Sequence, residues 1–169
     1  MEILTYLLLL LASFSGTLFA IFLSNICIEE INDVSSYVMT IIPFLISAIM
    51  FIVTEPNGRI FAAISAIIMF ILLWFFRGQY NPRILYISSS FLLYLSTIVG
   101  KILEVSIIIF IYGMLLATFE ASNILVYREN RNIKKSENIK LAKTIFSKYT
   151  YFILAGILFY ALFEYILKI

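Results

Sequence analysis

The stretch ILEVSIIIFIYGMLLATFEASNILVY, residues 102–127, decides the class of fold because it is apolar over the length of a membrane-crossing helix. A hydrocarbon core of about 30 Å is crossed by about 20 mainly apolar residues in an α-helix. The stretch also contains a carboxylate, Glu120. A charged side chain at the centre of a bilayer costs roughly 3 kcal/mol on insertion scales, so it indicates a function by default.

The rest of the chain is as apolar as this stretch. Of its 169 residues, 63% are hydrophobic and 13% are charged, and the mean hydropathy is +1.04. A soluble domain has about 25% charged residues. A chain with so few charges cannot cover a surface of this size with polar groups in water. The composition therefore predicts a polytopic membrane protein.

Six apolar segments follow one another along the chain: 3–27, 36–54, 60–76, 84–99, 102–127 and 150–167. Charged residues, Pro and Gly separate them, as is typical of turns between helices. The segments lack the alternation of barrel strands. We therefore predict an all-α fold, a single integral membrane domain over residues 1–169 with about six transmembrane helices. The boundary at Gly100-Lys101 is the weakest, because segments four and five could form one broken helix.

The distribution of basic residues predicts the orientation of the chain in the cell membrane. With six spans, the connections after segments one, three and five contain nine Lys and Arg residues, whereas the opposite side contains three. Basic loops stay in the cytoplasm. We therefore expect the segment 128–149 to be cytoplasmic and both termini to lie outside.

The segment 128–149 contains seven of the twelve basic residues. Such a run suggests nucleic acid first, but beside a membrane span it is more typical of contact with anionic lipid headgroups. We therefore predict lipid rather than nucleic acid as its partner, with five candidate residues: Arg131, Lys134, Lys135, Lys140 and Lys143. Its second part, 136–149, has the spacing of an amphipathic helix in the interface, or of a solvated helix end.

Several residue types that carry chemistry are missing or isolated. The chain has no histidine and one cysteine, Cys27, so His-ligated haem, His-containing zinc sites, Ser-His-Asp triads and internal disulfides are excluded. The cluster Glu29, Glu30 and Asp33 has no metal-binding spacing. We expect no cofactor, no metal ion and no catalytic constellation, so an enzyme is the least favoured class.

Small residues at four-residue spacing mark the faces on which helices pack in a membrane. They form three stripes: Gly16, Ala20 and Ser24; Ala62 and Ala66; Gly113, Ala117 and Ala121. Glu120 lies next to the last stripe, so we expect it to face protein rather than lipid.

Polar residues inside the apolar segments are the candidates for an ion or substrate pathway. Glu120 has Asn123 near it as a partner, and Glu164 has Tyr160 one turn earlier. The fourth segment adds hydroxyls at every third or fourth residue: Tyr86, Ser90, Tyr94 and Thr97. Such a stripe lines a water path or bonds neighbouring backbones. For Glu120 the alternative is a protonated carboxyl that is hydrogen-bonded inside the bundle.

Two stretches resemble known membrane proteins. SGTLFAIFLSNICIEEI, residues 15–31, resembles the first span of small uncharacterised archaeal polytopic membrane proteins, in which a paired glutamate follows that span. FEASNILVYR, residues 119–128, is similar to the helix of the small glutamate-bearing subunit of complex I-like proton pumps. That subunit has a second glutamate on an adjacent helix, whereas the second apolar segment of this chain has no carboxylate.

These observations lead to two hypotheses on function. The first is a small transport or ion-translocating membrane component with an intramembrane carboxylate, Glu120. The second is a non-catalytic subunit or assembly partner of a larger membrane complex. Association with itself as a homo-oligomer stays open.

The predicted topology can be tested with reporter fusions. A reporter after Lys135 should be cytoplasmic and one after the last residue, Ile169, should be external, because nine basic residues lie on one side and three on the other. If both reporters locate to the same side of the membrane, the six-span topology is wrong.

Overall fold

The computed structural model describes most of the chain. The backbone is described for residues 3–26, 28–75, 82–129 and 138–167. Side chains are described for residues 3–20, 41–75, 86–118, 120, 143, 145–147 and 150–165. The structural statements below concern these residues.

The described backbone forms six α-helices and one short 3-10 turn, and it contains no strand. In chain order these are α1 (Ile3–Ile26), α2 (Ile28–Thr54), η1 (Glu55–Asn57), α3 (Arg59–Phe75), α4 (Pro82–Val99), α5 (Ile102–Glu129) and α6 (Asn138–Leu167). The prediction of an all-α fold with six helices is confirmed.

Glycines end two of the helical stretches. Gly58 closes η1 with φ 116° and donates its N–H to the carbonyl of Glu55. Gly100 ends α4 with φ 76°, donating to the Thr97 carbonyl, while Lys101 donates to the Ser96 carbonyl. This pair of bonds is a Schellman motif, which suits Gly because other residues are strained at positive φ. Segments four and five are therefore two helices, not one broken helix.

One expected boundary was wrong. Helix α2 begins at Ile28, so Glu29, Glu30 and Asp33 lie within the helix and not in a connection. Helix α6 runs without a break from Asn138, so the part of 136–149 that the structure describes is helical and forms the first part of α6. In both cases the apolar pattern of the sequence marks only the apolar part of a helix. The helix itself continues into the neighbouring polar sequence.

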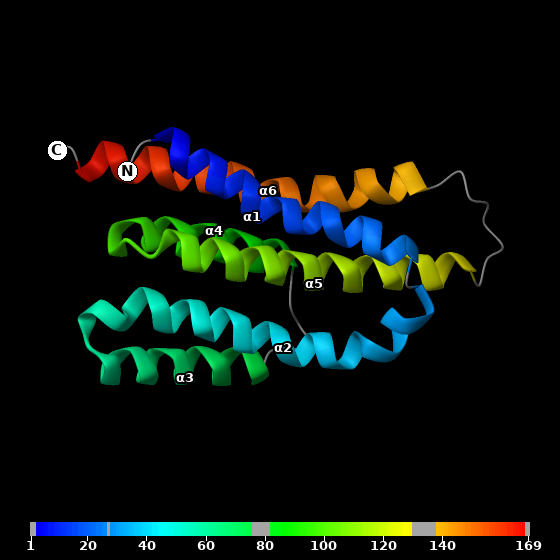
Figure 1. Ribbon diagram of the computed structural model, residues 1–169, viewed down its shortest axis with the longest axis horizontal. Helices are drawn as coiled ribbons and strands as arrows, with labels where there is room; N and C mark the ends of the chain where they lie inside the picture. Colours follow the sequence, from blue (N-terminus) through cyan, green and yellow to red (C-terminus); the bar gives the residue numbers. More distant parts are fainter. Residues whose placement is uncertain (1–2, 27, 76–81, 130–137, 168–169) are drawn as a thin grey trace.

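The helices lie roughly parallel and antiparallel to one axis, and two of them are short (Figure 1). Helices α3 and α4 have 17 and 18 residues, whereas α5 and α6 have 28 and 30. Figure 1 shows α3 and α4 beside one half of the longer helices, at the end where α1 begins and α6 finishes. We call this part the six-helix half; it comprises α3, α4 and residues 3–20, 41–54, 102–118 and 145–165.

Helix α1 packs most extensively on α5, and the two backbones come close together at Gly16. A Cβ atom at Gly16 would collide with the carbonyl oxygen of Phe110 and lie 3.0 Å from its carbonyl carbon. A neighbouring bond joins the same helices, since the Ser13 hydroxyl donates to the Ser106 carbonyl at 3.3 Å. The first predicted small-residue stripe therefore makes a helix contact at Gly16, and Ala20 is buried as well.

Helix α3 packs mainly on α2. Ala62 is fully buried, and the hydroxyls of Ser65 and Thr54 form a 2.9 Å hydrogen bond between the two helices. Only Ala62 and Leu73 are buried in α3. The stripe Ala62–Ala66 thus marks the face of α3 toward α2, and the opposite face of α3 is exposed.

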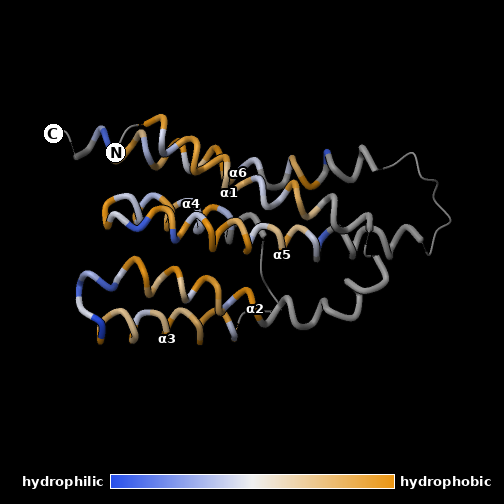
Figure 2. The backbone as a smooth tube through the Cα atoms, in the orientation of Figure 1, coloured by the Kyte–Doolittle hydropathy of each residue, from blue (hydrophilic) through white to orange (hydrophobic). Residues whose placement is uncertain are grey.

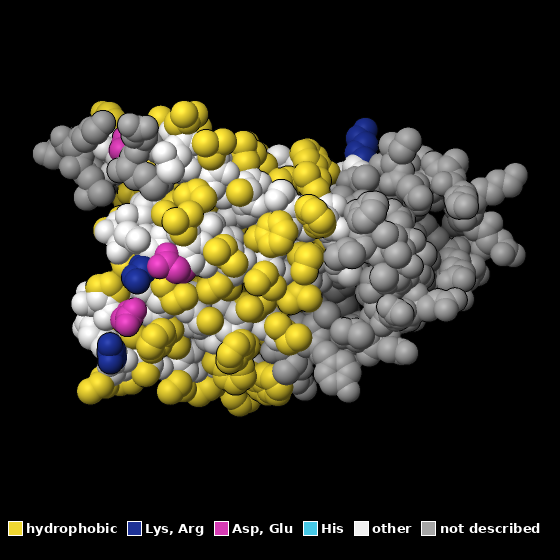
Figure 3. All heavy atoms as spheres, viewed as in Figure 1, with side chains coloured by type: hydrophobic (Ala, Val, Ile, Leu, Met, Phe, Trp, Pro, Cys, Tyr) yellow, Lys and Arg dark blue, Asp and Glu magenta, His cyan; other side chains and the backbone are white. Residues whose placement is uncertain are grey.

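The outer surface of the six-helix half is apolar. Figure 2 shows hydrophobic residues along its helices and hydrophilic ones at the turn between α2 and α3. On the face that Figure 3 shows, hydrophobic side chains cover the middle of the six-helix half. Acidic and basic side chains gather toward one end of it, on the left of the view. By length and composition, two helical stretches, Ile3–Ala20 and Ile145–Tyr165, could cross a membrane, and four others contribute shorter apolar stretches: Ile41–Asn57, Arg59–Phe75, Tyr86–Val99 and Ile102–Thr118.

A methyl group at Gly16 should destabilise the bundle. We expect Gly16→Ala to lower the free energy of unfolding by about 1–3 kcal/mol, because α1 must move away from the Phe110 carbonyl. Ser15→Ala is the control on the same helix, since Ser15 bonds only the carbonyl of Ala12 in its own turn. Thermal unfolding in detergent should separate the two variants; equal midpoints would contradict the close contact.

Candidate functional site

Glu120 is half-buried on α5, after a row of small inward-facing residues. Ala117 is fully buried, and a Cβ atom at Gly113 would lie 3.2 Å from the Thr17 hydroxyl and 3.3 Å from the Tyr86 hydroxyl. These small residues bring α1 and α4 close to α5. Glu120 lies seven residues after Gly113, about 10 Å farther along α5, within electrostatic reach of the Tyr86 hydroxyl. The expectation that Glu120 faces protein is thus confirmed in part.

The Tyr86 hydroxyl joins three helices. It donates to the carbonyl of Gly113 on α5 at 3.4 Å and shares a 3.2 Å hydrogen bond with the Thr17 hydroxyl on α1. Because Tyr86 donates to Gly113, the Thr17 hydroxyl is the donor in the second bond. Both residues are buried, at 1% and 0% exposure, so these bonds form without competition from water.

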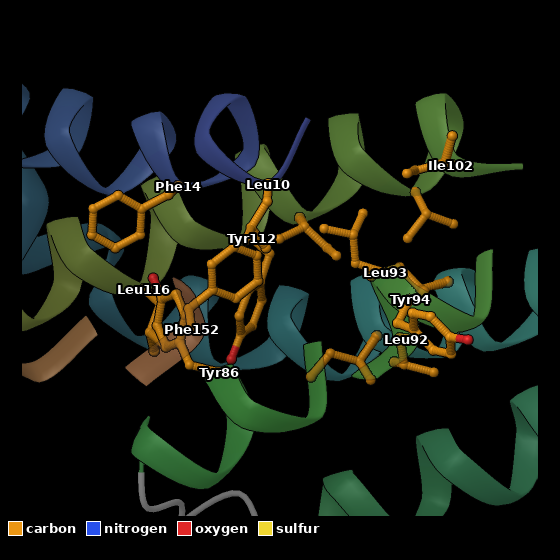
Figure 4. Packing of buried hydrophobic residues seen from close by; sticks show 14 of the residues in the cluster. Leu10, Phe14, Tyr86, Leu92, Leu93, Tyr94, Ile102, Tyr112, Leu116 and Phe152 are labelled. Atoms are coloured by element: carbon orange, nitrogen blue, oxygen red, sulfur yellow. The ribbon is translucent and has the colours of Figure 1, made fainter. Parts of the chain in front are cut away.

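Aromatic rings enclose this junction. The ring of Tyr86 lies 5.7 Å from the Tyr112 ring and meets the Phe152 ring edge-to-face at 6.0 Å. Figure 4 shows these three side chains next to one another. Phe152 is fully buried. The surroundings of the Tyr86 hydroxyl are therefore apolar, and its two hydrogen bonds offset the cost of burying it.

The hydroxyl stripe of α4 bonds backbone groups. Ser90 donates to the Phe152 carbonyl of α6 at 2.7 Å, and Thr97 donates to the Tyr94 carbonyl in its own helix at 2.7 Å. Tyr86 bonds α5 as described above. Of the two interpretations of the stripe, the bonds in the structure match the second, in which the hydroxyls bond neighbouring backbones.

A second polar cluster lies near the end of α6. The Tyr160 hydroxyl donates to the Glu164 carboxylate at 3.1 Å, as the spacing predicts. The Tyr160 ring stacks on Tyr6 at 4.8 Å and meets Tyr94 edge-to-face at 6.4 Å. Tyr94 is buried, and Glu164 acts on it electrostatically. Tyr94 and Glu164, two predicted pathway residues, are thus in one cluster.

Glu120 and Glu164 lie at opposite ends of the six-helix half. Glu164 comes twelve residues after Phe152, about 18 Å along α6. Glu120 comes seven residues after Gly113, about 10 Å along α5 in the opposite direction. Because Phe152 and Gly113 both contact Tyr86, the two carboxylates are separated by about 28 Å along the bundle.

Glu120 therefore marks the inner edge of the six-helix half. Helix α4 begins at Pro82, four residues before Tyr86. The start of α4 therefore lies about 6 Å from Tyr86 along the bundle, in the direction of Glu120. At the other end, Lys101 and Glu104 form an ion pair at 3.6 Å, with both side chains about half exposed. This pair is solvated and contributes little to stability.

Several predicted residues lie outside the described side chains. These are Asn123 and four of the basic candidates, namely Arg131, Lys134, Lys135 and Lys140. The fifth, Lys143, is exposed on α6. Among the described residues, no three Cys, Asp or Glu side chains lie close enough together to hold a metal ion.

The sequence did not identify Thr17 or Tyr6. Thr17 follows Gly16, and a hydroxyl beside a helix-packing glycine is a usable signal for a bond between helices. Tyr6 donates to the Gly156 carbonyl at 3.1 Å. No pattern along α1 shows that α6 lies beside it.

Comparison with protein families, curated proteins and solved structures finds no match to this chain. The resemblances in residues 15–31 and 119–128 therefore stay predictions.

Removal of the Tyr86 hydroxyl should weaken the junction of α1, α4 and α5. We expect Tyr86→Phe to lower the free energy of unfolding by about 1–3 kcal/mol, because the buried Thr17 and Gly113 groups lose a partner. Tyr165→Phe is the matched control, since Tyr165 is 73% exposed. Equal unfolding midpoints for the two variants would show that the hydroxyl bonds do not hold the junction.

Proposed function

We propose that this chain is an integral membrane protein whose six-helix half lies in the hydrocarbon. A long apolar helix in a soluble protein is mostly buried, but only 39% of the stretch Ile3–Ala20 and 25% of Ile145–Tyr165 are buried. Large apolar side chains are exposed on both stretches and on α3, with Leu4 at 63%, Ile60 at 79% and Leu154 at 59%. Water is a poor solvent for such a surface, and lipid is a good one.

The charges of the described residues support the same location. Arg59, Lys101 and Glu104 stand at turns or helix starts at one end of the six-helix half. Lys143 is exposed before the apolar part of α6 at the other end. In this proposal, the segment 128–149 is cytoplasmic and binds anionic lipid headgroups.

Within this membrane protein, we propose a role in ion translocation, with Glu120 as the key carboxylate. The observation that carries the proposal is that Glu120, a carboxylate on an otherwise apolar stretch of α5, is half-buried and lies within electrostatic reach of the buried Tyr86 hydroxyl. A carboxylate held near a polar junction in apolar surroundings can exchange a proton or hold a cation. Glu164, with its Tyr160 donor, provides a second carboxylate about 28 Å away at the outer edge.

A second function, a non-catalytic subunit or assembly partner, is favoured by a different observation. The α4 hydroxyls between the two carboxylates bond backbone carbonyls, which makes them part of the packing. In this case Glu120 helps to hold α4 and α5 together and transports nothing.

Flux in proteoliposomes distinguishes the two functions. We expect Glu120→Gln to abolish flux driven by a proton or cation gradient while the bundle still folds, because Gln keeps the shape but not the charge. Glu104→Gln is the matched control, since Glu104 is exposed and paired only at the surface, and should keep the flux of the wild type.

Equal flux from the wild type and Glu120→Gln would contradict the role of this carboxylate. No flux from the wild type under either gradient would contradict ion translocation and favour the subunit.

A further inference from the structure

We infer that the six-helix half is built for a hydrocarbon core of about 25 Å, thinner than the usual ~30 Å, and that short acyl chains cover the outer face of α3. This inference rests on the proposed membrane location. It concerns the lipid that the protein fits, whichever of the two functions holds.

Helix α3 sets the thickness because its outward face is exposed along its whole length. It packs mainly on α2, and only Ala62 and Leu73 are buried. Nine of its large apolar side chains are between 37% and 80% exposed: Ile60, Phe61, Ile64, Ile67, Ile68, Ile71, Leu72, Trp74 and Phe75. Any bilayer around the protein must therefore match this helix directly.

The length of α3 is short for a membrane span. Its described residues, Arg59 to Phe75, extend about 25 Å, and in the sequence only 17 residues, again about 25 Å of helix, separate the charges of Arg59 and Arg77. Tilting a helix reduces the thickness that it spans, so these lengths are upper limits. The longer helices do not change the hydrocarbon thickness that α3 can span. They continue past α3, and α3 still has to fit the bilayer with its own length (Figure 1).

Polar groups bound the helix at each end. Exposed Arg59 begins α3, directly after η1 and Gly58. After Phe75 the sequence soon becomes polar, with Arg77, Gly78 and Gln79. A thicker hydrocarbon core would therefore have to cover Arg59 at one end or Arg77 at the other.

Trp74 stands three residues before Arg77, in the last described turn of α3, where a tryptophan suits the membrane interface. Its ring stacks on Phe70 at 5.7 Å, and 37% of the residue is exposed. It is the single tryptophan of the chain, so its fluorescence reports the depth of this end of α3. In a thin core, Trp74 lies near the headgroups; in a thick core, α3 fits poorly at one end or both.

The experiment uses the full chain in phosphatidylcholine vesicles with myristoleoyl, oleoyl or erucoyl chains. Thermal stability should be highest in the shortest of these lipids and lowest in erucoyl lipid. In myristoleoyl vesicles, bromines near the headgroup should cause a larger loss of Trp74 emission than bromines deep in the acyl chains. A double variant, Trp74→Phe with Ile67→Trp, places the probe at the middle of α3 and should show the opposite order.

Each other outcome is informative. Highest stability in oleoyl or erucoyl vesicles, or stronger quenching of Trp74 by deep bromines, would overturn the inference and leave the membrane location intact. If the Ile67→Trp probe escapes quenching in vesicles that contain the protein, another protein surface, such as a second copy, covers α3, and the inference is wrong. If neither probe is quenched at any depth, the chain is not inserted and the proposed membrane location fails as well.

Discussion

The rest of the bundle depends on the close approach of α1 to α5. At Gly16 the two backbones are so near that no side chain fits against the carbonyl of Phe110. One turn further along α5, Gly113 leaves room for the hydroxyls of Thr17 and Tyr86. Tyr86 belongs to α4, so its hydroxyl in this small space joins α4 to both α1 and α5. Helix α6 then packs against the same ring through Phe152.

This arrangement bears on the two proposed functions in different ways. The hydroxyls of α4 are used for packing, and their bonds to backbone carbonyls bury the junction among apolar side chains. The two carboxylates lie instead near the edges, Glu120 where α4 begins and Glu164 close to the end of α6. Ion translocation would therefore need motion or water in the buried region between them. A subunit would need neither.

Part of the fold could be predicted from the sequence, because charge, Pro and Gly separate the apolar segments. Gly58 is an example, since the sequence EPNGR between two apolar segments forms η1 and the turn into α3, whereas the sequence left open whether Gly100 separates two helices. The inward direction of Gly113 and Ala117 also followed from their spacing. The start of α2 did not follow, because hydrophobicity finds the apolar part of a helix and misses a polar continuation such as residues 28–35. The bond between Tyr86 and Thr17 could not be predicted, because spacing along one helix does not identify its neighbour in space.

The proposed location of the six-helix half in hydrocarbon is tested most directly by nitroxide labels on the outward face of α1. Leu4 and Leu11 are both exposed, at 63% and 52%, and Leu11 lies about 10 Å farther along the helix, toward the middle of the six-helix half. Labels at these positions, in a chain with Cys27→Ser, are compared for collision with oxygen and with a water-soluble nickel chelate. In bilayers, we predict more oxygen and less nickel collision at Leu11 than at Leu4. Equal nickel collision at both positions would contradict the membrane location of the bundle.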